Sequence, residues 1–366
     1  MSAVRTLDVA LGARSYPIWI GAGLLADSAR WRAPIRGRHV LVVTNTTVAA
    51  LYLQRVLAGL AGLQHAHLVL PDGEAHKTLD ASGQIFAALA ALGASRDATI
   101  LALGGGVIGD LAGFAAACWM RGIDFIQMPT TLLAMVDSSV GGKTGVNLPQ
   151  GKNLVGAFHQ PRAVVADTGT LATLPVREYR AGLAEVVKYG AINDAAFFAW
   201  LEVHADALVA RDEAALAAAI QASCRAKSAI VARDEHERGE RALLNFGHTF
   251  AHAYEALADY DGSLLHGEAV AVGMVKAMAL SVRLGHCAPA ELERLRSHLG
   301  GLGLPTRVAE VSNRDFPVDD LLAAMGRDKK VEAARIRFVL ARRIGEAFTS
   351  ADVPPETVRT VLTEDV

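Results

Sequence analysis

The chain has 366 residues, more than one hydrophobic core usually organises, so two domains are expected. Hydrophobic residues make up 52% of the sequence and charged residues 20%, a balance that excludes a disordered chain. The formal net charge of −2 gives no support to nucleic acid or an anionic membrane as a partner, so any anion site must be local.

The cysteines and the N-terminal segment indicate the compartment. Cys118, Cys224 and Cys287 are far apart and form no CxxC motif, so neither a disulfide framework nor a cysteine zinc site is expected. Residues 1–21 show no basic segment followed by an apolar run, and the most apolar stretch, 98–120, is broken by glycines and Asp110. These features predict a cytoplasmic protein.

The first half of the chain alternates short apolar runs with amphipathic segments rich in Ala and Leu. This pattern predicts strands at 39–44, 67–70, 99–103, 125–128 and 164–166, and helices at 48–60, 79–92 and 110–120. Such alternation is typical of a parallel sheet flanked by helices.

After residue 175 the strand signal fades and helical patterns follow one another. Helices are predicted at 178–191, 195–209, 213–233, 248–258, 268–284 and 291–299, with a short strand-like piece at 336–340. We therefore predict an α/β domain over residues 1–176 and a mostly helical domain over residues 177–366.

A glycine-rich loop lies between a predicted strand and a predicted helix. Residues 104–109, GGGVIG, match G-x-G-x-x-G, in which glycines let backbone N–H groups approach a pyrophosphate at a helix N-terminus. A triple glycine can also be a simple tight turn, so the spacing leaves both interpretations open. The acidic residue usual about 20 positions later is not clear, because Asp124 precedes a strand; Asp72 and Glu74 are candidate ribose contacts instead.

A second loop, residues 137–145, ends in Gly-Lys-Thr. It does not match a Walker motif, because Asp137 stands where the first glycine should be. Lys143 and Lys152 still place two cations among glycines, which suits a phosphate of a substrate or cofactor. The alternative is a pair of solvated loop lysines.

Three histidines and a glutamate in the second half predict a metal centre. His248 and His252 share a helical face at i, i+4, and His266 begins another helix 18 residues after His248. Upstream, Glu185 and Lys188 share a face at i, i+3. One carboxylate and two imidazoles form a zinc-type ligand set that leaves coordination positions open for substrate hydroxyls. The alternative is a set of ordinary core or surface histidines; the H-E-x-x-H protease motif is absent.

Eight motifs in register resemble the 3-dehydroquinate synthase family. They are residues 72–77 (DGEAHK), 104–110, 129–131 (PTT), 137–143 (DSSVGGK), 151–153 (GKN), 184–190 (AEVVKYG), 245–249 (NFGHT) and 266–268 (HGE). The resemblance implies a Rossmann-like α/β domain joined to a helical metal-binding domain. It also implies a phosphate-eliminating lyase of the shikimate pathway, which makes 3-dehydroquinate from 3-deoxy-D-arabino-heptulosonate 7-phosphate and regenerates NAD⁺ in each turnover.

The resemblance further implies a role for individual residues. The metal, Zn²⁺ or Co²⁺, would be bound by Glu185, His248 and His266. The NAD contacts would be Asp72, Gly73, Glu74, Ala75, His76, Lys77, Gly106, Val107, Ile108, Gly109, Asp110, Thr130, Thr131, Lys143, Lys152, Thr170, Leu171, Ala172 and Thr173. The substrate contacts would be Asp137, Lys143, Asn153, Lys188, Lys227, Arg241, Asn245, His252 and Lys330. Arg121 would reach across a homodimer interface.

The substrate that the resemblance implies carries a carboxylate and a phosphate, so two cationic pockets are expected. Lys227 and Arg241 suit the carboxylate, since a guanidinium can pair with it bidentately. Lys188 suits the oxygen at the oxidised carbon, where negative charge develops. The groups that suit the phosphate are Lys143, Asn153, Asn245, His252 and Arg121 of the partner subunit.

Departures from the family pattern are small, and three rival functions stay open. Ala251 replaces a usual glycine, and Phe246 and Trp119 replace residues that are often Leu and Tyr. The nearest rivals are other sugar-phosphate cyclases, which differ mainly in anion-binding residues; Lys227 and Arg241 favour a substrate with a carboxylate. More distant rivals are a metal-dependent polyol dehydrogenase that releases NADH and a nucleotide-binding regulatory module without a metal.

Overall fold

The computed structural model of the chain describes residues 4–237, 239–327, 331–332 and 335–364. Lys330, a predicted substrate contact, lies outside the described residues. The chain divides into two compact units. Unit 1 comprises Met1–Pro175 and Leu216–Ala232, and unit 2 comprises Val176–Ala215 and Arg233–Val366.

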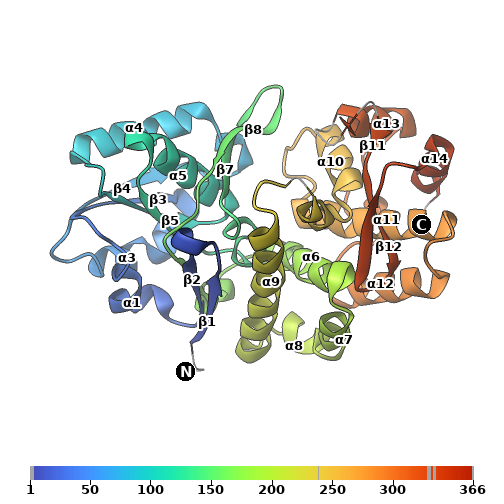
Figure 1. The fold of residues 1–366 in the computed structure, drawn as a ribbon, viewed down its shortest axis with the longest axis horizontal. Coiled ribbons are helices and arrows are strands. Elements are labelled where there is room, and N and C mark those ends of the chain that lie inside the picture. The colour runs from blue at the N-terminus through green and yellow to red at the C-terminus, as the bar shows by residue number, and fades with distance from the viewer. Residues whose placement is uncertain (1–3, 238, 328–330, 333–334, 365–366) are drawn as a thin grey trace. The chain divides into compact units, whose positions relative to one another are not determined.

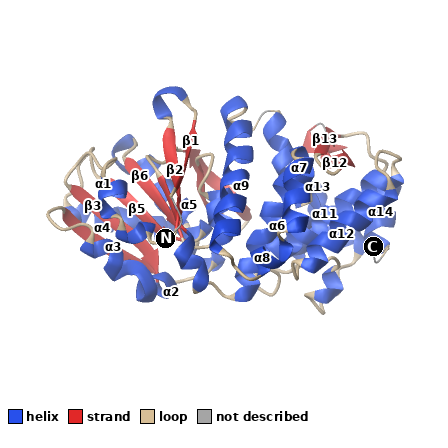
Figure 2. Cartoon of the chain, turned by 90° about the horizontal axis from the view of Figure 1, so that it is seen from below, coloured by secondary structure: helices blue, strands red, loops and turns tan. Residues whose placement is uncertain are grey.

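Unit 1 is built on a seven-stranded sheet, and Figure 2 shows its strands among the helices that flank them. The strands are β1 (Arg5–Val9), β2 (Tyr16–Gly21), β3 (His39–Asn45), β4 (Gln64–Leu70), β5 (Thr99–Gly104), β6 (Asp124–Pro129) and β9 (Val164–Asp167). Their order is β1-β2-β9-β6-β5-β3-β4, and every neighbouring pair is parallel except β1 with β2. The predicted parallel sheet is confirmed; β1 and β2 were not predicted.

Alternate residues of the central strands enter two different cores. On β3, Leu41 and Val43 belong to the core that includes residues of α4 (Leu79–Leu92) and α5 (Gly106–Cys118). Val40 and Val42 belong to the core that includes residues of α1 (Ser28–Arg32) and α3 (Gln54–Ala58). Because side chains alternate along a strand, burial on both faces needs an unbroken apolar run, which is the pattern at residues 40–43 and 100–103.

Local capping explains where the helices of unit 1 begin and end. Helix α4 has the predicted bounds, because the Thr78 side chain accepts a hydrogen bond from the Ala81 N–H and Gly93 ends the helix at φ 68°. Helix α5 begins at Gly106 instead of residue 110, since the extended backbone of Gly105 caps it directly after β5. The predicted helix 48–60 is interrupted: α2 (Thr46–Val48), a π-helical turn (Ala49–Leu53) and α3 follow one another.

Two further elements of unit 1 carry predicted site residues. Strands β7 (Lys143–Leu148) and β8 (Gly151–Phe158) form an antiparallel hairpin that was not predicted, and Figure 1 shows it in green. A Cβ at Gly156 would lie 2.2 Å from the Thr144 carbonyl oxygen, so the glycines that suggested a loop allow close strand pairing. Helix α9 (Glu213–Arg233) contributes residues 216–232 to unit 1.

Unit 2 is mostly helical, as predicted. Its elements are α6 (Val176–Asn193), α7 (Ala195–Val203), α8 (Ala205–Val209), α10 (His248–Leu257), α11 (His266–Arg283), α12 (Pro289–Gly301), α13 (Val318–Arg327), α14 (Pro355–Thr363), and strands β10 (Val331–Glu332), β11 (Arg335–Ile336), β12 (Phe338–Arg343) and β13 (Glu346–Ser350). The single helix predicted at 195–209 is wrong: the chain turns at His204, whose Nδ1 lies 2.8 Å from the Trp200 carbonyl oxygen. Among the described residues, no helix combines the length and the apolar character that a membrane crossing requires.

Glycines let α11 approach both α6 and α10. A Cβ at Gly267 would lie 1.9 Å from the Ala181 carbonyl oxygen, and a Cβ at Gly273 would lie 2.2 Å from the Gly247 carbonyl oxygen. Gly247 itself adopts φ 83° as the N-cap of α10, a conformation that glycine adopts without strain. The first turns of α10 and α11 are therefore held close to the middle of α6.

Candidate active site

Glu185, His248 and His266 converge in unit 2. Glu185 lies on α6, and the two histidines are the first residues of α10 and α11. Their ligand atoms all lie within 4.8 Å of one another. Oε1 of Glu185 is 3.5 Å from Nε2 of His248 and 3.7 Å from Nε2 of His266.

These spacings fit one shared metal ion. Two ligand atoms bound at about 2.0–2.1 Å in a tetrahedral site stand about 3.4 Å apart. The two measured distances are longer than a good N–H···O hydrogen bond, which spans about 2.7–3.2 Å. The fully buried Glu185 carboxylate pairs with Lys188 through Oε2, whereas both imidazoles approach its other oxygen, Oε1. The donor set and its geometry therefore suit Zn²⁺ or Co²⁺.

Each imidazole is oriented through its second nitrogen. Nδ1 of His248 lies 3.3 Å from the Phe246 carbonyl oxygen, and Nδ1 of His266 lies 3.3 Å from Oε2 of Glu255. Acceptors at Nδ1 favour the tautomer whose Nε2 lone pair is available to a metal. Glu255 was not predicted, although it stands at i+7 from His248 and i+3 from His252, a helical spacing that points to it.

The electrostatics of the metal-free cluster centre on His266. Burial lowers the pKa of its imidazole, but the charge of Glu255 and the contacts with Glu185 outweigh burial and raise the pKa to about 10. In the absence of metal the ring is therefore protonated at neutral pH, and its positive charge compensates the two carboxylates.

Lys188 and His252 flank the three residues. The Lys188 ammonium forms an ion pair with Oε2 of Glu185, one helical turn away, and only 1% of this lysine is exposed. The ring centroid of His252 lies 5.5 Å from that of His248 and 6.3 Å from that of His266. A buried ammonium and a third imidazole thus lie beside the candidate metal position.

Arg241 and Asn245 lie in the helical turn Glu240–Asn245 before α10. The buried Arg241 guanidinium donates a hydrogen bond of 2.5 Å from Nη1 to the Glu235 carbonyl oxygen. Asn245 donates from Nδ2 to Oε1 of Glu237 at 2.9 Å. Glu237 was not predicted, and its place in a charged run gave no signal of this contact.

The carboxyl ends of the parallel strands gather the predicted cofactor contacts of unit 1. Strands β3 and β5 are neighbours, but β4 lies beyond β3 and β6 beyond β5, which creates a topological switch point where α/β sheets bind ligands. The glycine loop follows β5 at this point. A Cβ at Gly106 would lie 3.1 Å from Ser138 Oγ, and a Cβ at Gly109 would lie 2.7 Å from Gln127 Oε1. These glycines therefore allow the helix N-terminus to sit close against its neighbours.

Side chains around this edge are joined by short hydrogen bonds. Asn45, which ends β3, donates to Oδ1 of Asp72 at 2.6 Å. The buried Lys77 ammonium donates to Oδ2 of Asp110 at 2.5 Å and to Oδ1 of Asn153 at 2.6 Å. Burial raises the pKa of the Asp110 carboxyl, although the charge of Lys77 opposes this shift.

The predicted turn 170–173 also receives a contact from the α2–α3 region. The Tyr52 hydroxyl lies 2.5 Å from Thr173 Oγ1 and 3.3 Å from the Thr170 carbonyl oxygen. After β6, the Thr130 N–H donates to the Gly104 carbonyl oxygen at 3.0 Å. The end of β6 is thereby joined to the end of β5, and the turn after β9 is joined to the α2–α3 region.

The remaining predicted cations of unit 1 differ in exposure. On α9, Lys227 is buried, and its ammonium donates to Oδ1 and to the carbonyl oxygen of Asp137 at 2.8 and 2.6 Å. Lys143 is exposed at the start of β7, and Lys152 is half-buried on β8. Arg121 is exposed in a turn where its φ is 68°.

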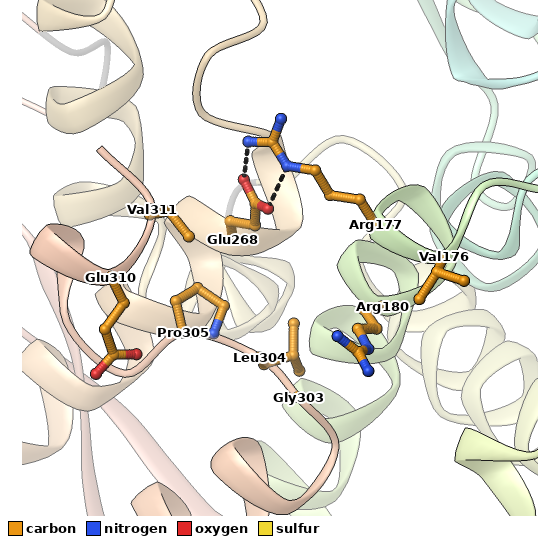
Figure 3. A pocket seen from close by; sticks show the side chains of 9 residues that line it. All are labelled: Val176, Arg177, Arg180, Glu268, Gly303, Leu304, Pro305, Glu310 and Val311. Carbon is orange, nitrogen blue, oxygen red and sulfur yellow. Dashed lines mark hydrogen bonds and ion pairs between the residues drawn. The ribbon is translucent and has the colours of Figure 1, made fainter. Parts of the chain in front are cut away.

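A cavity of about 410 Å³ in unit 2 lies beside the first turn of α6 (Figure 3). Its lining includes Arg177, Arg180 and Glu268, and Arg177 binds the Glu268 carboxylate through two hydrogen bonds of 2.7 Å. Glu268 also accepts the Leu265 N–H at 2.9 Å, so these contacts fix the start of α11. None of the three candidate metal ligands lines this cavity, and we do not place the reaction there.

The fold and the site define a class of protein: a Rossmann-like α/β unit combined with a helical unit that carries a carboxylate and two imidazoles. The family model for the N-terminal part of 3-dehydroquinate synthase matches residues 67–181, and the model for its C-terminal part matches residues 182–331. The chain belongs to the 3-dehydroquinate synthase family. It is 58% identical to the 3-dehydroquinate synthase of Rhodospirillum rubrum, over 93% of this chain and 90% of the relative.

Two solved structures of cyclases share the fold over almost the whole chain. One is 2-deoxy-scyllo-inosose synthase complexed with carbaglucose-6-phosphate, NAD⁺ and Co²⁺, at 26% identity and a TM-score of 0.90, covering 99% of this chain and 100% of the other. The other is 2-epi-5-epi-valiolone synthase from Streptomyces hygroscopicus subsp. jinggangensis with NAD⁺ and Zn²⁺, at 31% identity and a TM-score of 0.86, covering 99% and 98%.

Proposed function

We propose that this protein is a 3-dehydroquinate synthase. It converts 3-deoxy-D-arabino-heptulosonate 7-phosphate to 3-dehydroquinate and phosphate by transient oxidation, phosphate elimination, reduction and intramolecular aldol closure. The observation that carries the proposal is the convergence of Glu185, His248 and His266 in a chain that belongs to this family. The enzyme is a carbon–oxygen lyase of the shikimate pathway and serves aromatic amino acid biosynthesis.

We propose that NAD and one divalent metal, Zn²⁺ or Co²⁺, are the cofactors. Solved relatives hold NAD⁺ with Co²⁺ or Zn²⁺, and the spacing of the three ligand atoms suits such an ion. When bound, NAD⁺ takes up and returns a hydride while the metal acts as a Lewis acid. The switch point between β3 and β5 and the glycine loop are the proposed NAD site. The proposed NAD site is completed by residues 72–77, Thr130, Thr131, Lys143, Lys152 and residues 170–173.

The residues of unit 2 supply positive charge and hydrogen bonds. Lys188 would stabilise negative charge on a substrate oxygen, because its ammonium is buried and already oriented by Glu185. We assign Arg241 to the substrate carboxylate, since a buried guanidinium offers several fixed donors. His252 and Asn245 are assigned to the phosphate.

The residues of unit 1 complete the proposed set. Lys143 and Asn153 are assigned to the phosphate, and Lys227 with Asp137 to the carboxylate end of the substrate. Lys227 is oriented by two hydrogen bonds to Asp137, so its ammonium does not need to be ordered when substrate binds.

We further propose a cytoplasmic homodimer in which Arg121 contributes to the phosphate site of the partner subunit. Two features support this assembly: Arg121 is exposed at φ 68°, and the neighbouring Met120 is 47% exposed at φ 51°. Consecutive left-handed residues other than glycine cost about 1 kcal/mol or more each, and such strain tends to occur at functional positions.

The experiment that tests the function follows phosphate and NADH together. Purified protein, catalytic NAD⁺ and the heptulosonate phosphate should release one phosphate per substrate with no lasting rise in NADH absorbance. A chelator should stop phosphate release, and Zn²⁺ or Co²⁺ should restore it. Accumulation of one NADH per substrate without phosphate would favour a polyol dehydrogenase, and turnover only of sugar phosphates that lack a carboxylate would favour another cyclase.

A further inference from the structure

Asn147, near the end of β7, contacts two segments of unit 1: residues 74–77, which are distant in the sequence, and Asn153 on the neighbouring strand β8. Its N–H donates to the Lys77 carbonyl oxygen at 2.8 Å, and its Nδ2 donates to Oε1 of Glu74 at 2.8 Å. Its Oδ1 accepts the Asn153 N–H at 2.9 Å. A single side chain on the hairpin thus connects the segment before α4 with the start of β8.

The two segments also meet through their own side chains. Lys77 donates to Oδ1 of Asn153 at 2.6 Å and to Oδ2 of Asp110, on α5, at 2.5 Å. Asn147, Asn153, Lys77 and Asp110 therefore form one continuous network from the hairpin to the glycine loop. Lys77 is only 4% exposed. Its hydrogen bonds are therefore stronger than in water, because the effective dielectric constant of the protein interior is lower.

The backbone of Asn153 shows why support is needed at this point. Its φ is 53°, in the left-handed region, although its side chain is exposed. Asparagine adopts this conformation more easily than most residues, but it still does so at a cost. The hydrogen bond from its N–H to Asn147 and the bond from Lys77 to its side chain hold the residue in this conformation.

We propose that Asn147 is a positioning residue that holds the cofactor segment 74–77 and the substrate contact Asn153 in one arrangement. This inference rests on the proposed function, in which residues 72–77 contact NAD and Asn153 contacts the substrate phosphate. In this proposal Asn147 acts on both ligands through other residues. It acts through two separate arms: Nδ2 holds Glu74, and Oδ1 holds Asn153.

Two substitutions separate the arms. In Asn147→Ala both side-chain hydrogen bonds are lost, so the Kd for NAD⁺ and the KM for the heptulosonate phosphate should each rise about tenfold. In Asn147→Asp an oxygen can still accept the Asn153 N–H, but the other oxygen faces the Glu74 carboxylate. The Kd for NAD⁺ should then rise about tenfold while the KM for substrate changes less than about twofold.

A compensating change reverses the polarity of the Glu74 arm. In the double variant Asn147→Asp, Glu74→Gln, the new amide can donate to the new carboxylate, so Asn147→Asp should weaken NAD⁺ binding less in the Glu74→Gln background than in the wild type. Glu74→Gln alone is measured beside it. Asn313→Asp, which adds the same charge at an exposed position of unit 2, is the control and should change neither constant.

The readouts are calorimetric titration of NAD⁺ into NAD-free protein, phosphate release at saturating NAD⁺, and the melting temperature of each variant. Support would be a selective effect of Asn147→Asp on the Kd for NAD⁺ that becomes smaller when Glu74 is already replaced by Gln. The inference would be overturned if Asn147→Asp raised the Kd for NAD⁺ and the KM for substrate by the same factor, as Asn147→Ala is expected to do. It would also be overturned if Asn147→Ala changed neither constant. If the wild type released no phosphate from the heptulosonate phosphate, the proposed function would fail, whereas the NAD⁺ titrations would still test the Glu74 arm.

Discussion

Oε2 of Glu255 lies 3.3 Å from Nδ1 of His266, and Nε2 of the same ring lies 3.7 Å from Oε1 of Glu185. The imidazole is therefore held between two buried carboxylates, one on α10 and one on α6. A carboxylate at Nδ1 fixes the tautomer and raises the basicity of a ligating histidine. This relationship makes Glu255 a testable part of the metal centre.

Glu255→Gln should weaken metal binding by about 10- to 100-fold, because the amide orients His266 less firmly and adds no negative charge. The Kd for Zn²⁺ can be measured by competition with a chromophoric chelator. Glu293→Gln removes a carboxylate from an exposed ion pair on α12 and is the matched control, which should leave the Kd unchanged. An unaltered Kd in Glu255→Gln would show that this carboxylate does not support the ligand.

His248→Ala should abolish the stabilisation that metal gives to the fold. For an ion at about 100 times its Kd, binding adds about 2.7 kcal/mol to the free energy of unfolding, so chelation of the wild type should lower Tm by several degrees. Because the variant lacks one of three ligands, chelator should shift its Tm little. Equal shifts in both proteins would place the metal elsewhere.

Metal binding should release about one proton at pH 7.5. In the metal-free protein the pKa of His266 is raised to about 10, so the ring must lose a proton before Nε2 can bind an ion. Calorimetry in two buffers of different ionisation enthalpy measures the number released. Metal affinity should therefore rise with pH up to about 10, and a binding enthalpy that is independent of the buffer would contradict the assignment.

The raised pKa of His266 also affects the stability of the metal-free fold, which should fall as the pH rises, whereas metal affinity should rise. A pKa raised from 6.5 to about 10 means that the protonated ring stabilises the folded state fully below pH 6.5, and this contribution is lost as the pH rises through about 10. Melting of chelated protein between pH 6 and pH 10 should show a decline in Tm. The decline should be smaller in Glu255→Gln, since the charge of Glu255 is the main cause of the raised pKa.

Gly267→Ala should disrupt the metal site without touching a ligand. The added methyl would stand 1.9 Å from the Ala181 carbonyl oxygen, so α11 must move away from α6 and take His266 with it. We expect lower metal affinity and a destabilisation of about 1–3 kcal/mol, as for other overpacked contacts. Gly300→Ala on α12 meets no atom within 4 Å and should be neutral or stabilising by up to about 1 kcal/mol. Comparable Zn²⁺ affinity in both variants would show that close helix contact is not required.

Much of the fold could be predicted because its signals are local. Residues 40–43 and 100–103 are unbroken apolar runs, since both faces of β3 and β5 are buried. Helix α4 ends at Gly93 because glycine adopts φ 68° without strain. The β7–β8 hairpin was not predicted, because its signal depends on the pairing of two strands and is not local. Its glycines read as a loop, while in the structure they permit the close pairing of Gly145 and Gly156.

The sequence by itself determined the candidate ligand types and their helical faces. Period and spacing place His248 and His252 on one face, and the order of the motifs identifies the family. These properties follow from residues near one another in the chain, where backbone geometry alone sets the distances.

Only the tertiary structure decided which groups meet. It brought Nε2 of His248 and of His266 to one oxygen of Glu185, and it placed Glu255 behind His266. It also joined Lys227 to Asp137 and Asn147 to Glu74, pairs with no common motif. The physical reason is that these distances depend on how closely helices and strands approach, and that approach is set by contacts such as Gly267 against Ala181, which no local periodicity encodes.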